Sequence, residues 1–158
     1  LGPLCNPANV KRQVMGIFDG RLTEKIANVL KILGSKHAMI VHGDDGLDEI
    51  STTSDTHYTE LLPDSKIKSG IISPINFNIA TTDLKTLKGG SPDYNAKILQ
   101  HILNGEKGPQ RDIVVLNAAA GIKVGGRASS MEEGIKLAEE AIDSGLAHNV
   151  LKSLINIK

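Results

Sequence analysis

The sequence is poor in cysteine, aromatic residues and long apolar runs. It contains one cysteine, Cys5, so no disulfide can form within the chain, as is typical of proteins from a reducing cytoplasm. Trp is absent, and two Phe and two Tyr leave the core to aliphatic side chains. No apolar run reaches the roughly 18 residues that a membrane span requires, and no basic-then-apolar leader is present. We therefore expect a cytoplasmic protein without membrane contact.

The chain also has little net charge. Its 18 Lys and Arg are matched by 18 Asp and Glu, so no overall field draws it to nucleic acid or to an anionic membrane, and we expect no nucleic-acid partner. The length of 158 residues fits one domain. Because the sequence starts with apolar residues at Leu1 rather than with Met, we expect a piece of a longer chain.

The first part of the chain has the pattern of a strand, a helix and a strand. Short apolar runs at 14–18 and 38–41 are typical of strands buried in a parallel sheet. Between them, apolar residues from Leu22 to Leu33 recur at helical spacing, and Gly34 can end the helix. This order predicts two parallel strands joined by a crossover helix.

The following segments favour strands and then helices. Alternating, β-branched stretches at 50–53, 58–61 and 66–72 predict antiparallel or edge strands. Three helices are predicted by their start signals or periodicity, and these begin at Pro92 after Ser91, after the capping box Ser130 to Glu133, and near Val150. Residues 112–120 fit a strand or a buried helix, and the Ala run favours the helix. We expect an α/β fold with a partly parallel central sheet, flanking helices and an antiparallel or edge section.

The segment from His42 to Ser51 reads HGDDGLDEIS and places four carboxylates directly after a predicted strand. Ligands in open α/β sheets bind at the carboxyl ends of strands. Gly43 and Gly46 allow the turn that Asp48 and Glu49 need to converge, and carboxylate oxygens suit Mg²⁺. The spacing does not fit an EF-hand. From the residues alone, a solvated acidic turn is the favoured interpretation. Asp44 and Asp45 are expected to face water or to support the loop from behind the other two acids.

Other candidate sites are weaker. Lys88-Gly89-Gly90 before a helix resembles a phosphate loop but lacks the P-loop spacing, so a helix-entry loop is favoured. The segments 125–127 and 11–12 are interpreted as a turn between helices and as solvent-facing cations. The histidines show no metal-ligand spacing and are interpreted as structural or surface residues. His42 is the one exception, because it borders the acidic loop.

Several stretches resemble, in matching order, the anthranilate phosphoribosyltransferases. The stretches are LGPLCNPA (1–8), KRQVMG (11–16), VHGDDGLDEIS (41–51), KGGSPDYNA (88–96), GEKGPQRD (105–112), LNAA (116–119) and AIDSG (141–145). The resemblance implies transfer of phosphoribose from 5-phosphoribosyl-1-pyrophosphate to the amine of anthranilate, with release of pyrophosphate, in tryptophan biosynthesis. It also implies the α/β catalytic-domain fold shared by nucleoside phosphorylases and these transferases.

The resemblance carries four residues into functional roles. Asp48 and Glu49 correspond to the family's Mg²⁺-binding acidic pair, which neutralises charge on the leaving pyrophosphate. Gly2 and Pro3 correspond to the loop that lines the anthranilate pocket. No catalytic side chain is assigned.

The resemblance also implies that residues 1–158 form the C-terminal part of the catalytic domain. The family's glycine-rich diphosphate loop and small helical domain have no counterpart in the sequence, so we expect this polypeptide to be inactive alone and the full-length parent to be a homodimer. Two alternatives stay open. One is a pyrimidine-nucleoside phosphorylase, and the other is a non-catalytic relative that binds nucleic acid.

Overall fold

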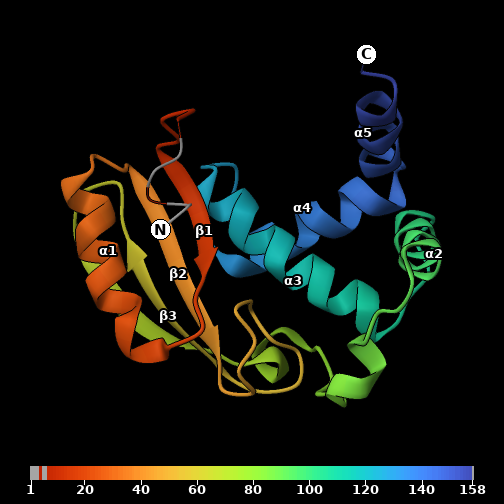
Figure 1. Cartoon of the computed structure of the whole chain (residues 1–158), viewed down its shortest axis with the longest axis horizontal. Helices are drawn as coiled ribbons and strands as arrows, with labels where there is room; N and C mark the ends of the chain where they lie inside the picture. Colours follow the sequence, from red (N-terminus) through yellow and green to blue (C-terminus); the bar gives the residue numbers. More distant parts are fainter. Residues whose placement is uncertain (1–3, 5–6, 158) are drawn as a thin grey trace.

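The computed structural model describes Leu4 and residues 7–157, which form a four-stranded sheet with helices on both faces (Figure 1). The strands are β1 (Arg12–Gly16), β2 (His37–Gly43), β3 (Thr56–Leu61) and β4 (Ile67–Ile72). The helices are α1 (Thr23–Ile32), α2 (Pro92–Leu103), α3 (Pro109–Val124), α4 (Met131–Asp143) and α5 (Leu146–Ile155), with 3-10 turns η2 (Gly20–Leu22), η3 (Pro74–Phe77) and η4 (Leu84–Leu87). None of the helices described is both long and apolar enough to cross a membrane.

The sheet has the order β1-β2-β3-β4 and is partly parallel, as predicted. β1 and β2 run parallel and are connected through α1, whereas β2, β3 and β4 pair antiparallel. The first predicted strand extends two residues too far, since β1 ends at Gly16 and Phe18 is 81% exposed. The predicted α/β fold class is therefore confirmed.

β2 lies at the centre of the packing because both of its faces are covered. Ala38 and Ile40 point into the cluster formed with α1, and Met39 and Val41 point into the cluster formed with α3. Successive side chains of a strand alternate between faces, so a continuous apolar run is what a doubly covered strand needs. β2 thereby fixes the position of the loop that follows Gly43.

The segment at 112–120 is helical, because it belongs to α3. Ala119 and Ala120 of this helix are fully buried, and a Cβ on Gly134 of α4 would lie 2.6 Å from the carbonyl oxygen of Ala119. Small residues thus let α3 and α4 approach closely on one side of the sheet. α2 begins at Pro92 behind the Ser91 cap, as predicted, and α5 projects beyond α4 (Figure 1).

Candidate active site

The acidic segment lies against the carboxyl ends of the two parallel strands. Gly16 ends β1, and a Cβ built on it would lie 1.4 Å from the carbonyl oxygen of Asp48. No side chain can occupy that position unless the loop moves away. The backbone before Asp48 closes on β2 in turn, since the amide of Gly43 donates to the carbonyl of Leu47 at 2.8 Å. Gly46 adopts the left-handed φ of +91° that this turn requires.

Asp45 holds the loop together from inside, which corresponds to the expected supporting role rather than to an acid that faces water. Its carboxylate accepts hydrogen bonds from the hydroxyls of Ser51, at 2.5 Å, and Thr53, and from the amide of Leu47 at 3.0 Å. Burial raises the pKa of Asp45, but these hydrogen bonds together outweigh it and leave the pKa below its usual value. Asp44 is exposed, as predicted, and lies 3.1 Å from His57.

The prediction of a strand at 50–53 is wrong. Backbone groups of this segment form hydrogen bonds with side chains instead of with a neighbouring strand. Asn117 of α3 accepts from the amide of Ile50 at 2.9 Å and donates to its carbonyl at 2.7 Å. The hydroxyls of Ser51 and Thr53 turn to Asp45, and the amide of Ser51 donates to Thr56 Oγ1 at 2.9 Å. Side-chain hydrogen bonds of this kind compete with sheet formation. Ile50 is fully buried, so the loop is anchored directly after Glu49.

Asp48 and Glu49 are exposed on this anchored backbone. Within the described part of the chain, neither carboxylate has a hydrogen-bond or ion-pair partner. Glu49 lines an apolar cleft of about 630 Å³ together with Lys85, Lys88 and Ile113, whereas Asp48 is not among the lining residues. No three metal-ligating side chains cluster within residues 7–157 and Leu4. Two free carboxylates fit a hydrated Mg²⁺, which takes one or two protein carboxylates and completes its shell with water and phosphate oxygens.

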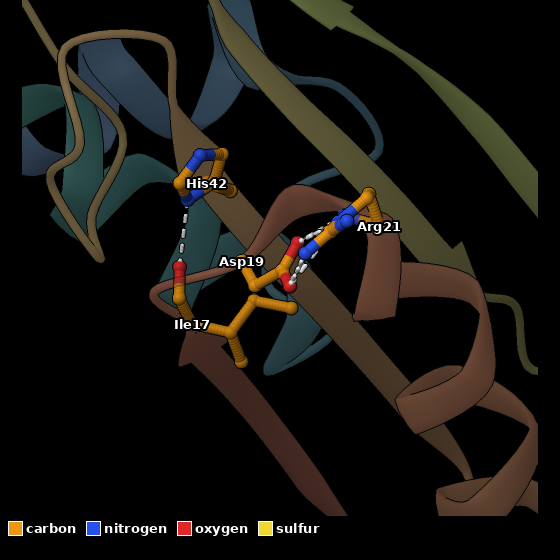
Figure 2. Close-up of polar contacts among 4 residues, drawn as sticks. All are labelled: Ile17, Asp19, Arg21 and His42. Atoms are coloured by element: carbon orange, nitrogen blue, oxygen red, sulfur yellow. Dashed lines mark hydrogen bonds and ion pairs between the residues drawn. The ribbon is translucent and has the colours of Figure 1, made fainter.

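Two further contacts shape the ends of β1 and β2, and Figure 2 shows both. His42 Nδ1 lies 2.8 Å from the carbonyl oxygen of Ile17 and so joins the two strand ends. The Asp19 carboxylate caps η2 through the amide of Arg21 and accepts from its guanidinium at 2.8 to 3.3 Å. These hydrogen bonds from Arg21 lower the pKa of Asp19 to about 2. His42, singled out in the sequence because it borders the acidic loop, therefore contacts the backbone that follows β1.

Of the remaining predicted sites, one lies outside the residues that the structure describes and the others lie within them. Gly2 and Pro3 lie outside the described residues. The loop at 88–90 enters α2, and Asn95 fixes it by accepting from the amide of Gly90 at 2.8 Å. Residues 125–127 form the turn between α3 and α4, as predicted. Arg12 is solvent-exposed but donates to the carbonyl of Val124 at 2.7 Å, a contact that the sequence did not suggest.

Sequence reasoning missed two of the residues that hold the loop in place. Gly16 and Asn117 fix its backbone together with Asp45, yet neither of them was assigned a role there. Gly16 carried a readable signal, because a glycine that closes an apolar strand marks close approach of another backbone. Asn117 carried none, since it comes from a helix far along the chain from Ile50.

Comparison with known proteins supports a single family. A family model described as "Glycosyl transferase family, a/b domain" matches residues 1–148. The anthranilate phosphoribosyltransferases of Methanocorpusculum labreanum and Acetivibrio thermocellus are each 51% identical over 155 residues, which is 98% of this chain and 45% of theirs. The chain thus spans less than half the length of these curated relatives.

Solved structures agree with this match. The crystal structure of anthranilate phosphoribosyltransferase from Thermus thermophilus is 34% identical, with a TM-score of 0.85 over 96% of this chain and 44% of that one. The Saccharomyces cerevisiae enzyme in complex with PRPP and Mg is 28% identical, with the same TM-score and coverage. The chain belongs to the glycosyl transferase family with this α/β domain, and the relatives compared above are anthranilate phosphoribosyltransferases.

Proposed function

We propose that residues 1–158 are the C-terminal part of the catalytic domain of an anthranilate phosphoribosyltransferase. The full-length enzyme transfers phosphoribose from 5-phosphoribosyl-1-pyrophosphate to the amine of anthranilate, a step of tryptophan biosynthesis. One observation carries the proposal: Asp48 and Glu49 are exposed and free of partners in the described structure, on a backbone that Gly16 and Asn117 hold at the carboxyl end of the sheet. The relatives' names and the Saccharomyces structure with PRPP and Mg support it.

The chemistry explains why acids are needed near a substrate rich in phosphate. The bond from ribose C1′ to pyrophosphate oxygen breaks, a bond from C1′ to the anthranilate nitrogen forms, and the amine loses one proton. Mg²⁺, when bound, neutralises the negative charge that grows on the departing pyrophosphate. Asp48 and Glu49 would hold that ion. Lys85 and Lys88 add positive charge in the cleft that Glu49 lines.

The remaining parts of the proposal concern the anthranilate pocket, the assembly of the full-length enzyme and the activity of this polypeptide. Gly2 and Pro3 line the anthranilate pocket, where a residue without a side chain lets the aromatic ring approach the backbone. The full-length enzyme is a cytoplasmic homodimer. This polypeptide alone does not turn over substrate, which is consistent with its covering 45% of its relatives' length.

The test is a turnover assay of the full-length enzyme with anthranilate, 5-phosphoribosyl-1-pyrophosphate and Mg²⁺. We expect product only when all three are present and none from the 158-residue polypeptide. Product formed by the polypeptide would contradict its inactivity. Phosphorolysis of thymidine or uridine without the pyrophosphate donor would instead identify a nucleoside phosphorylase, and tight, salt-sensitive DNA binding would identify the nucleic-acid-binding relative.

A further inference from the structure

A second cavity lies along the face of the sheet that packs against α3 and α4. It has a volume of about 660 Å³ and is lined by residues at the start of β1 and β2, by the β3–β4 hairpin, and by the start of α4. The cavity shares no lining residue with the cleft at Glu49, so the two sites are distinct.

The cavity has one buried carboxylate in its wall. Glu60 is only 3% exposed, and its Oε1 accepts from Lys123 Nζ and lies 2.8 Å from His37 Nε2. Its other oxygen, Oε2, has no hydrogen-bond partner among the residues that the structure describes. An ionised carboxylate oxygen accepts hydrogen bonds, so Oε2 is an open acceptor in the wall of the cavity.

Positive groups lie beside this acceptor. Lys68 is directly opposite Glu60 in the β3–β4 register, so both side chains point to the same face of the sheet. Lys68 is exposed, and no acidic partner lies within ion-pair distance in the described part of the chain. The first turn of α4, at Met131 and Glu132, also lines the cavity with the positive end of a helix.

The wall also carries the charged side chains of Arg12, Lys123 and Glu132. Its apolar members include Met39, Tyr58, Ile72, Phe77 and Met131. Two of them are aromatic and can pack against a ring or a branched aliphatic chain. The volume falls within the range of small-molecule sites, in which apolar walls surround a few oriented polar groups.

We propose that this cavity binds a free α-amino acid with a large apolar side chain. The ammonium group donates to Glu60 Oε2, the carboxylate lies near Lys68 and the N-terminus of α4, and the side chain packs against Tyr58 and Phe77. A zwitterion suits this wall, because the wall carries cations as well as the open oxygen of Glu60. The inference is independent of the function proposed for the acidic loop.

The test is isothermal titration of the 158-residue chain with L-phenylalanine as the probe. We expect a dissociation constant of about 1 mM or below, from the size of the ligand. Three matched controls each lack one feature: 3-phenylpropionate has no ammonium, phenethylamine has no carboxylate, and glycine has no apolar side chain. Each should bind roughly tenfold more weakly or not at all. Absence of phenylalanine binding, or equal binding of the probe and its analogues, would overturn the proposal.

Two lysine variants test whether phenylalanine binds in this cavity. Lys68→Gln should weaken phenylalanine binding by roughly tenfold, because it removes the cation without touching a described ion pair. Lys66→Gln is the matched control on the same hairpin, where Lys66 pairs with Asp64 outside the cavity, and should leave binding unchanged. Circular dichroism checks that both variants are folded. If both variants bind like the parent, the ligand lies elsewhere and the proposal fails.

Discussion

The carboxylates near the two ends of β2 differ in burial and in pairing. At the carboxyl end, Asp48 and Glu49 are exposed and have no partner in the described structure. At the amino end, Glu60 of the neighbouring strand is buried and contacts His37 and Lys123. A charge in water costs little free energy when left unpaired, whereas a buried charge must be paired. The exposed acids are therefore free to bind a ligand through both oxygens, whereas one oxygen of the buried acid is committed to the fold.

The same division occurs inside the acidic loop. Asp45 is partly buried and accepts three hydrogen bonds, whereas Asp48 and Glu49 accept none from described residues. One acid therefore stabilises the loop and leaves the other two available. Substitutions at these acids should change activity or stability, but not both equally.

The largest effect is expected on activity, from Asp48→Asn combined with Glu49→Gln in the full-length enzyme. The proposed role predicts that kcat/KM falls roughly 10³-fold and that the Mg²⁺ dependence weakens. The free energy of unfolding of the 158-residue chain should change by less than about 0.5 kcal/mol, since neither acid has a described partner. Asp44→Asn is the control and should retain activity. An unchanged Mg²⁺ dependence in the double variant would refute the assignment.

Glu60→Gln is expected to lower the stability of the fold, in contrast to the double variant of Asp48 and Glu49. Removing this charge leaves Lys123 and the buried His37 without their anion, and should lower the free energy of unfolding by about 3 kcal/mol. Urea denaturation measures the change. Glu140→Gln, at an exposed position on α4, should change it by less than about 0.5 kcal/mol. If the two variants change the free energy of unfolding equally, burial does not distinguish Glu60 from an exposed acid.

Gly16→Ala tests whether close backbone approach holds the loop. Its Cβ would overlap the carbonyl of Asp48, so we expect a loss of about 2 to 3 kcal/mol together with movement of the loop, visible in the amide chemical shift of Ile50. Gly121→Ala is the matched control, since no atom lies within 4 Å of its Cβ. In the interior of α3 that change should stabilise by up to about 1 kcal/mol. A Gly16 variant with normal stability and an unmoved Ile50 signal would contradict the fold of the loop.

Asp45→Asn should cost about 1 to 2 kcal/mol, because the hydroxyls of Ser51 and Thr53 lose a charged acceptor. The folded pKa of Asp45 is lowered, so its stabilisation is complete above the unfolded pKa of about 3.9 and is lost as the pH falls through the folded pKa. Acid denaturation curves of the variant should therefore be flatter below about pH 4. A variant with the parent's acid dependence would show that Asp45 does not stabilise the loop.

The sequence predicted the elements whose signals are local. α2 begins where Ser91 and Pro92 place it, and α1 ends before Gly34, which has a left-handed φ of +79°. The apolar run of β2 predicted a strand covered on both faces. These features depend on caps, on periodicity and on backbone geometry, which neighbouring residues determine.

Predictions failed where distant residues compete for hydrogen bonds. The segment at 50–53 has β-branched residues, yet Asn117 and Asp45 bind its polar groups and exclude a strand. The role of Asp45 stayed open between facing water and supporting the loop, because its burial depends on how the loop folds over β2. Neither outcome can be derived from a window of neighbouring residues.

The sequence alone determined the α/β class, most element boundaries and the family resemblance, because those depend on apolar periodicity, caps and short motifs. Only the tertiary structure decided which acids are free and which are structural. That decision depends on burial and on long-range contacts such as Gly16 to Asp48 and Asn117 to Ile50. It also depends on the pairing of β3 with β4, which places Lys68 beside the open oxygen of Glu60. Identical side chains acquire different roles because folding changes the cost of leaving a charge unpaired.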